Sequence, residues 1–376
     1  MNRRTLINVL KYVLAIGLLT FVVVRNWGEP DDGKGLAFVW QKHVVEHEPT
    51  HWDLLALAFL CLAVGDMLTF VRWYVLVRAQ GLPFTLYNAF RLGLIGLFFN
   101  AFLPGAIGGD IIKAAFIARE QSRRTVAVAT VLIDRALALW ALVWLVAIVG
   151  AGFWAAGLLQ VQGEQALKRI VLGAAGIVGV SLLGWLLLGL LPPHRAERFA
   201  GRLERLPKVG GSAAEFWRAV WMYRCRQKSV LAAMGIALIA HVGFVLTFFF
   251  SAQVLLAPGQ EVPGLPAHFL IVPIGMVIQA VPLFPGGAGI GEAGFGGLYQ
   301  LLGYSAALGV LGSLVQRVVM WLLGLLGYVV YLRLKSVVQP AGEAPVSEPL
   351  AAEVRVNGAD RRRATDRVTD RAVPLP

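Results

Sequence analysis

Long apolar runs alternate with short polar connections along most of the chain. A helix needs roughly 20 apolar residues to cross the hydrocarbon core of a bilayer. Six runs reach that length, at residues 5–24, 54–77, 126–159, 170–191, 230–256 and 306–332. Two more apolar segments, at residues 86–103 and 269–284, are interrupted by asparagine, arginine or proline. The pattern predicts an all-α polytopic membrane protein with eight hydrophobic segments, six of them full crossings.

Lysine and arginine are unevenly distributed among the polar connections. They gather before the first run, at residues 119–124, at residues 192–228 and in the C-terminal tail, whereas residues 27–53 are mainly acidic. Cytoplasmic loops carry the excess of lysine and arginine, so both termini are predicted to be cytoplasmic. This assignment requires residues 86–118 to enter and leave the membrane on the same side. We therefore expect a re-entrant hairpin, whose non-helical tip is tolerated where protein or a water-filled cavity surrounds it.

Two stretches of the chain share a pattern of Pro-Gly, small residues and then an acid. They read LPGAIGGDIIKAAF and FPGGAGIGEAGF, and their expected tip residues are Pro104, Gly105, Gly108, Gly109, Pro285, Gly286, Gly287 and Gly289. Asp110 precedes Arg135 by 25 residues, and Glu292 precedes Arg317 by the same number. By the count of crossings the second hairpin starts outside, which predicts an inverted repeat of two opposed hairpins. Paired broken segments of this kind indicate a transport site near the midplane of the membrane. The alternative is that the Pro-Gly clusters only mark ordinary loops between helices.

Charged residues inside the apolar segments need an explanation, because each costs roughly 2.5–3.5 kcal/mol at the bilayer centre. We expect Asp110 to pair with Arg135 and Glu292 with Arg317, and Asp110 and Lys113 to share a helix face. One hypothesis is that these pairs only lock the helices together. The other is a central cavity whose arginines and half-helix ends bind a phosphate-bearing headgroup. The predicted headgroup-binding residues are Arg72, Asn100, Asp110, Lys113, Asp134, Arg135, Glu292, Gln316 and Arg317.

Composition changes the picture in only a few respects. The chain is 57% hydrophobic with a mean hydropathy of +0.68, and its net charge of +12 is attributed to orientation and anionic lipid rather than nucleic acid. Residues 192–228 have the spacing of amphipathic helices in the headgroup region, or of a solvated helical hairpin packed on the bundle. We expect a membrane domain over residues 1–335 and a disordered cytoplasmic tail over residues 336–376.

Other motifs do not indicate an enzyme or a cofactor site. GEPDDGKG resembles a phosphate-binding loop but lacks the final Ser or Thr and any preceding strand. His43, His47 and His51 are spaced by four and could bind a metal on a helix, although an exposed amphipathic loop is the simpler interpretation. No set of residues suited to covalent catalysis stands out, and the two cysteines have no metal-binding spacing. We expect a transporter without a metal or cofactor.

Taken in order, these motifs resemble a known family. Arg72-Trp73, then Asn100 with LPGAIGGD and Lys113, Asp134-Arg135, and FPGGAGIGE with Arg317 are similar to the lysylphosphatidylglycerol synthase transmembrane region, a flippase-like family of the UPF0104 type. The resemblance covers about residues 10–334. It departs from the family pattern at Lys113, where arginine is frequent, and at Gly291, where a larger residue is common.

The resemblance implies a lipid flippase in a bacterial inner membrane. Its substrate would be an aminoacyl-phospholipid, or a polyprenyl-phosphate-linked or hopanoid-related lipid. The alternative is a membrane-embedded enzyme or an accessory subunit of a glycolipid or hopanoid pathway. The family's early arginine falls on Arg72, and its other charged positions fall on Asp110, Asp134, Arg135, Glu292 and Arg317. The expected partners are membrane lipids, anionic headgroups at the cytoplasmic face and enzymes of a lipid pathway, with no nucleic acid. Because only a short polar tail follows the apolar part, we do not expect the chain to synthesise lysyl-lipid.

Overall fold

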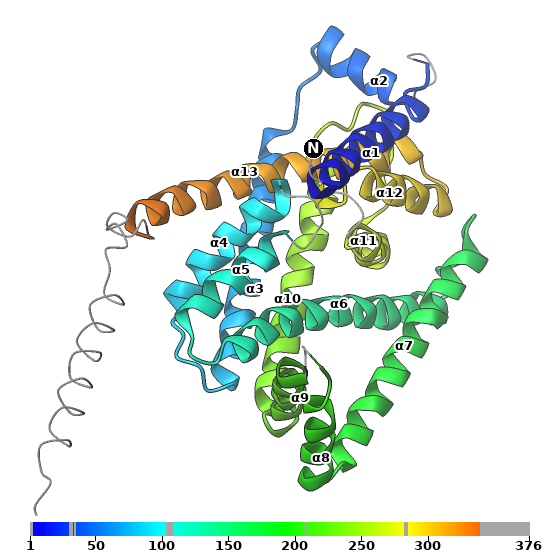
Figure 1. Ribbon diagram of the computed structural model, residues 1–376. Coiled ribbons are helices and arrows are strands. Elements are labelled where there is room, and N and C mark those ends of the chain that lie inside the picture. The colour runs from blue at the N-terminus through cyan, green and yellow to red at the C-terminus, as the bar shows by residue number, and fades with distance from the viewer. Residues whose placement is uncertain are drawn as a thin grey trace, which may run out of the picture. The chain divides into compact units, whose positions relative to one another are not determined.

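The computed structural model describes residues 3–29, 33, 35–102, 108–207, 210–281 and 285–338, and within these ranges it contains helices and no strands (Figure 1). The helices are α1 (Arg3–Arg25), α2 (Leu36–Trp40), η2 (Gln41–Val45), α3 (Trp52–Ala79), α4 (Leu86–Phe102), α5 (Gly108–Glu120), α6 (Arg124–Ala155), α7 (Glu164–Leu190), α8 (Pro193–Glu204), α9 (Gly210–Cys225), α10 (Gln227–Ser251), α11 (Leu265–Gln279), η3 (Pro285–Gly287), α12 (Ile290–Leu301) and α13 (Ala306–Val338). Contacts divide the chain into Met1–Val330 and Tyr331–Pro376. Almost all of the predicted tail, residues 339–376, lies outside the described residues, so its disorder stays a prediction.

Five helices are long and apolar enough to cross a membrane, namely α3, α6, α7, α10 and α13. They correspond to five of the six predicted crossings, which confirms an all-helical, multi-pass membrane protein. The sixth predicted crossing is α1, whose 23 residues would extend roughly 34 Å at the helical rise of 1.5 Å per residue. That α1 crosses the membrane as a sixth full span stays a prediction.

The helices α3 and α10 cross at a pair of glycines. A Cβ on Gly243 would lie 3.3 Å from the Cα of Gly65 and 3.0 Å from the carbonyl oxygen of Cys61. The absence of side chains at this point lets the two backbones touch. On one side of the crossing, apolar residues of α3 and α10 pack against α13, with Leu62, Phe244 and Val319 all buried. On the other side both helices contact α6. These two helices therefore form a central pair, which contacts α4, α6, α9 and α11.

Two pairs of shorter helices form hairpins, α4 with α5 and α11 with α12. The first hairpin is closed at its base, where Arg91 Nη2 lies 2.8 Å from Glu120 Oε1. The second is closed by His268 of α11 and Tyr299 of α12, whose Nε2 and hydroxyl are 2.8 Å apart. In each pair the chain therefore leaves near the place where it entered. This geometry is the one expected of the predicted hairpins, although their re-entry into a membrane stays a prediction.

The first helix of each hairpin packs on a long helix from the other half of the chain. A Cβ on Gly327 of α13 would lie 2.0 Å from the carbonyl oxygen of Leu94, so α4 rests directly on α13. In the same way, α11 packs against α6. Each hairpin is thus held by the helix that follows the other hairpin.

Hydrogen bonds gather the connecting segments into two groups. The backbone N–H of His51 donates to Val254 (3.1 Å), and that of Gly163 donates to Leu301 (2.7 Å), which joins the loops before α3 and α7 to the segment after α10 and to the end of α12. At the C-terminal end of α3, Gln80 Nε2 donates to Ala219 of α9 (2.9 Å). The first group contains loops predicted to be external, and the second contains segments predicted to be cytoplasmic.

The acidic connection at residues 27–53 contains more regular structure than the sequence suggested. Residues 36–40 form α2, and the chain continues as the π-helical η2 up to Val45. Within this segment Lys42 Nζ lies 2.5 Å from Glu46 Oε2, one helical turn away. The hydrogen bond raises the pKa of Lys42 and lowers that of Glu46. Buried Leu36 packs with Val22 of α1 and Val310 of α13, which explains why this connection is folded.

Candidate functional site

Asp110 is the centre of the first charged group. It lies in the first turn of α5 and is buried at 7% exposure. Its Oδ2 accepts a hydrogen bond of 2.6 Å from Arg135 Nη1 of α6, and its Oδ1 lies 3.4 Å from Lys113 Nζ. Lys113 also lies over the ring of Trp73, 5.5 Å from its centroid. The predicted pairing of Asp110 with Arg135, and the shared helix face with Lys113, are confirmed.

Glu292 is the centre of the second group and is completely buried. Its Oε1 accepts a hydrogen bond of 2.8 Å from Arg317 Nε, while its Oε2 accepts the backbone N–H of Gly289 at 2.7 Å. Arg317 Nη2 lies 2.6 Å from Oε1, where it adds charge attraction without an aligned hydrogen bond. Arg317 Nη1 donates to the carbonyl oxygen of Gly286 (2.9 Å). The second predicted pair is therefore confirmed, and it is tied to the hairpin tip.

The two groups occupy equivalent positions in their helices. Asp110 is the third residue of α5 and Glu292 is the third residue of α12. Arg135 is the twelfth residue of α6 and Arg317 is the twelfth residue of α13. Each acid lies in the first turn of its helix, where the helix dipole stabilises negative charge. The spacing of 25 residues thus reflects the same arrangement of a short helix, a turn and a long helix in both halves.

The ends of the two hairpins meet. A Cβ on Gly286 would lie 3.5 Å from the carbonyl oxygen of Ala101 and 3.8 Å from that of Asn100. The Asn100 side chain turns back into its own hairpin, where Oδ1 accepts the backbone N–H of Gly109 at 2.8 Å. A short path of contacts therefore leads from Asp110 through Gly109 and Asn100 to Gly286. Beyond Gly286 the path reaches Arg317 and Glu292.

The tip glycines have the conformations that the sequence suggested, where the structure describes them. Gly286, Gly287 and Gly289 have φ of 54°, 67° and 82°, a region that favours glycine. Gly108 and Gly109 are buried in the first turn of α5. A Cβ on Gly109 would lie only 1.9 Å from the carbonyl oxygen of Gly96, so α4 and α5 touch there. Pro104 and Gly105 lie outside the described residues, as does the side chain of Pro285.

Arg72 and Asp134 form a third buried ion pair that the sequence did not indicate as a pair. Arg72 Nε and Nη2 donate to the two carboxylate oxygens of Asp134 at 2.7 and 3.1 Å. The fork therefore joins α3 to α6 next to Arg135. Arg72 Nη1 is buried and has no hydrogen-bond partner within the described ranges. In the second half Gln316 occupies the place of Asp134 and is buried at 4% exposure.

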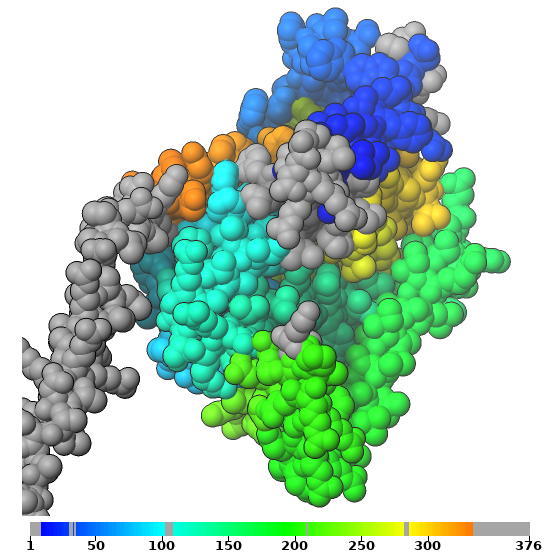
Figure 2. Space-filling model, viewed as in Figure 1, coloured from blue at the N-terminus to red at the C-terminus, as the bar shows by residue number. Residues whose placement is uncertain are grey.

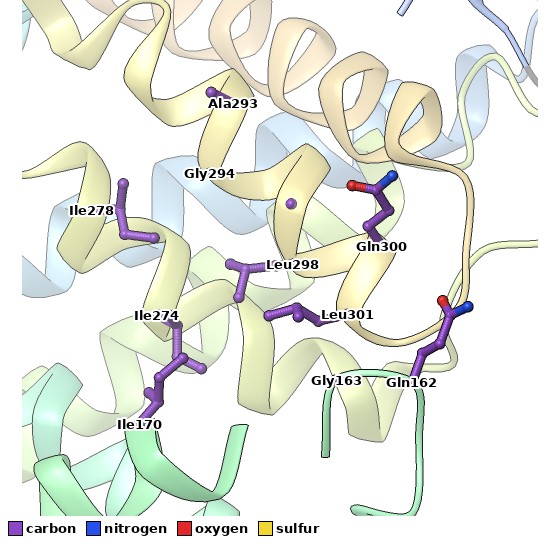
Figure 3. Close-up of a pocket in the computed structure, with 11 residues that line it drawn as sticks. Gln162, Gly163, Ile170, Ile274, Ile278, Ala293, Gly294, Leu298, Gln300 and Leu301 are labelled. Atoms are coloured by element: carbon purple, nitrogen blue, oxygen red, sulfur yellow. The ribbon is translucent and has the colours of Figure 1, made fainter. Parts of the chain in front are cut away.

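A cavity of about 640 Å³ lies beside the second hairpin (Figure 3). Its walls come from the start of α7 and from α11 and α12, and they are mostly apolar. Ile274 and Leu298 line its interior, while Gln162 and Gln300 lie at the end near the loops. It runs along α12 from Ala293, the residue after Glu292. Neither Arg135 nor Arg317 lines this cavity, so their expected meeting in one central cavity stays a hypothesis.

Several contacts of the site could not be recognised in the sequence. Gly96 of α4 contacts Gly109 of α5, but it lies in an apolar run in which nothing distinguishes it from other residues. The backbone of Ala101 contacts the opposite hairpin, and a backbone contact has no residue signature. His268 and Tyr299 are 31 residues apart, and only their equivalent places in the two arms of a hairpin could have indicated their contact.

Comparison with known proteins identifies a family of membrane proteins. The family profile of the lysylphosphatidylglycerol synthase TM region matches residues 10–327. A UPF0104 membrane protein of Pyrococcus horikoshii is 24% identical over 337 residues, which cover 86% of this chain and 97% of the relative. No solved structure matches the chain. Because the match covers most of the sequence, the chain belongs to the family of the lysylphosphatidylglycerol synthase transmembrane region.

Proposed function

We propose that this protein moves an anionic or phosphate-bearing lipid between the two leaflets, and that it acts as a transporter rather than an enzyme. The observation that carries the proposal is the meeting of two equivalent acid–arginine pairs through Gly286 and Asn100. Broken helices that meet in this way are typical of transport sites near the midplane. The lipid named in the family description, lysylphosphatidylglycerol, carries a phosphate group as well as a lysyl group, which agrees with a phosphate-bearing substrate.

Arg135 is the side chain that we propose first binds the headgroup. Its exposed fraction is 27%, compared with 7% for Arg317. Only its Nη1 has a hydrogen-bond partner within the described ranges, so Nε and Nη2 can donate to a phosphate. Lys113 adds a second positive charge on the other side of Asp110. Lys113 and Arg135 thus both face Asp110, and they are the two cations that we propose meet the anionic part of the headgroup.

Arg317 has the opposite arrangement. Nε and Nη2 face Glu292, Nη1 donates to the tip of its own hairpin, and the ion pair is buried. We infer that the structure represents one of two states, with the first pair accessible and the second closed. In the other state the arrangement would be reversed, with Arg317 accessible. Alternating exposure of the pairs would pass the headgroup from one side to the other, while the acyl chains remain in the bilayer.

Transport in vesicles tests this proposal. Purified protein in liposomes should move a fluorescent phosphatidylglycerol between leaflets, as measured by the fraction of probe that a membrane-impermeant quencher can reach. Arg135→Ala should abolish transport, because it removes the fork that binds phosphate, and Arg135→Lys should keep part of it. Arg91→Gln is the matched control, since it removes an arginine from an ion pair at the base of the same hairpin.

The panel of lipids decides between the competing outcomes. Transport no faster than in protein-free vesicles, for aminoacyl, polyprenyl-phosphate and simple anionic lipids alike, would contradict the proposal. Chemical turnover of any lipid in detergent, with the product identified by mass spectrometry, would favour the enzyme or the accessory subunit instead. Equal transport by wild type and Arg135→Ala would assign the charge pairs to helix packing alone.

A further inference from the structure

The helical hairpin of α8 and α9 carries an uncompensated stripe of positive charge. Arg195, Arg198 and Arg202 follow one another at spacings of three and four, so they share one face of α8. All three are exposed, and none has an ion-pair partner within the described ranges. The hairpin forms the green projection at the bottom of Figure 2. Three arginines on one face without acids favour an anionic ligand.

The acidic residues of α8 are held on its opposite face. Glu197 and Glu204 are seven residues apart, and Arg218 of α9 binds both of them. Arg218 Nε lies 3.0 Å from Glu197 Oε1, and its Nη2 lies 2.9 Å from Glu204 Oε1. These hydrogen bonds lower the pKa of Glu197. The two acids are therefore paired with Arg218 on one face of α8, apart from the three arginines on the other face.

The three arginines line a pocket of about 390 Å³ together with Leu191, Phe199 and Trp217. Trp217 is fixed by its Nε1, which donates to the carbonyl oxygen of Ala196 at 3.0 Å. It packs edge to face with Phe199, with ring centroids 4.7 Å apart. The pocket thus has cationic donors on one side and an aromatic wall on the other. This combination suits a phosphate group that is attached to an apolar body.

The pocket adjoins the end of a helix that is long and apolar enough to cross the membrane. On α7, Leu183, Leu186, Leu187 and Leu190 recur at spacings of one, three and four, and they are 56%, 64%, 58% and 79% exposed. They therefore form an apolar stripe that ends one residue before Leu191 of the pocket. Arg224 of α9 donates to the carbonyl oxygen of Gly189, which fixes the hairpin to this end of α7.

We propose that this pocket binds the headgroup of an anionic phospholipid, with the acyl chains lying along the leucine stripe of α7. The arginines would donate to the phosphate, and Trp217 would lie at the boundary between headgroup and acyl chains, where its ring is favoured. This site is separate from the ion pairs at the hairpin tips. The inference therefore goes beyond lipid transport, and it holds or fails independently of it.

Lipid retention by the purified full chain tests this inference. Native mass spectrometry should show phosphatidylglycerol bound at least about tenfold more tightly than phosphatidylcholine of the same acyl chains, since guanidinium groups favour an anionic phosphate. The triple variant Arg195→Gln, Arg198→Gln and Arg202→Gln should lose this preference. The matched control is Arg119→Gln, Arg226→Gln and Lys228→Gln, which removes the same charge from exposed positions outside the pocket and off α8, and it should keep the preference.

Three results would overturn the inference. Equal loss of preference in both triple variants would indicate general attraction to the basic connection. An unchanged preference in the pocket variant would place the lipid elsewhere. Binding of glycerol 3-phosphate as tight as that of the lipid would assign the pocket to a free phosphate.

A fluorescence measurement tests the same site without removing charge. Phosphatidylglycerol with brominated acyl chains should quench part of the tryptophan emission, and this part should disappear in Trp217→Phe. The same variant should not change quenching by brominated phosphatidylcholine at low lipid fractions, because that lipid has no preference for the pocket. If Trp217→Phe leaves the quenching by phosphatidylglycerol unaltered, the acyl chains do not lie beside this pocket, and the inference is wrong.

Discussion

At the scale of single residues, the Glu292 side chain is held at both of its carboxylate oxygens. Both of its carboxylate oxygens accept hydrogen bonds, one from Arg317 and one from the backbone of Gly289. Glutamine has the same shape but only one accepting oxygen, so one of these donors would face an NH₂ group. It would also leave the Arg317 charge buried without its partner. An unpaired buried charge costs about 3–5 kcal/mol, which is a large fraction of the stability of a folded protein.

We therefore predict that Glu292→Gln lowers the free energy of unfolding by about 3–5 kcal/mol. Thermal unfolding in detergent, followed by circular dichroism, measures this change. The matched control is Glu120→Gln, which removes a half-exposed carboxylate from its ion pair with Arg91 and should cost at most about 1 kcal/mol. Similar melting temperatures for the two variants would show that the Glu292 pair is dispensable for stability.

The pair of Arg72 and Asp134 gives a second prediction at the same scale. Each partner alone would be left as a buried charge, so Arg72→Leu and Asp134→Leu should each destabilise the protein by about 3–5 kcal/mol. The double variant removes both charges together and should be clearly more stable than the sum of the single effects predicts. A double-mutant cycle of unfolding free energies measures the difference. Strict additivity would mean that the two side chains do not interact energetically.

At the scale of helices, close packing depends on glycines at a few crossings. A Cβ on Gly109 would enter the carbonyl group of Gly96, which is backbone and cannot move aside without shifting α4 from α5. We predict that Gly109→Ala lowers the melting temperature and abolishes transport, because the shift also moves Asp110. Gly173→Ala on α7 is the control, since a Cβ there meets no atom within 4 Å. Normal transport by Gly109→Ala would show that the position of α5 is not critical.

The helices and the two acid–arginine pairs could largely be predicted from the sequence, whereas their packing could not. Apolar runs and Pro-Gly breaks are local signals, and the repeated spacing of 25 residues revealed which acid meets which arginine. The partner of Asp134 was not predictable, because Arg72 lies 62 residues away on a helix with no matching signal. The crossing of α3 and α10 at Gly65 and Gly243 was hidden as well, since the sequence contains 42 glycines.

At the scale of the whole membrane domain, hydrogen bonds join loops that the sequence assigns to the same side of the membrane. The segment before α3 is bonded to Val254, and the loop before α7 is bonded to Leu301. The base of the first hairpin joins the opposite group, because Arg123 Nη1 donates to the carbonyl oxygen of Gln80, whose side chain donates to Ala219 of α9. The two hairpins therefore have their bases in different groups of loops. This arrangement supports an inverted repeat, and it requires that the two groups lie on opposite sides of the membrane.

Cysteine labelling tests this sidedness with single exposed positions. In a background with Cys61→Ala and Cys225→Ser, we predict that Glu261→Cys, in the loop before α11, reacts with a membrane-impermeant maleimide added outside intact cells. Arg205→Cys, at the end of α8, should react only after the membrane is opened, because the basic connection is expected to be cytoplasmic. Lysed cells provide the control, since both positions are exposed and should then react equally. If both residues react from outside, an even number of crossings separates them. The second hairpin is placed opposite the first only if α10 crosses the membrane once between these positions, so that result would exclude the inverted arrangement.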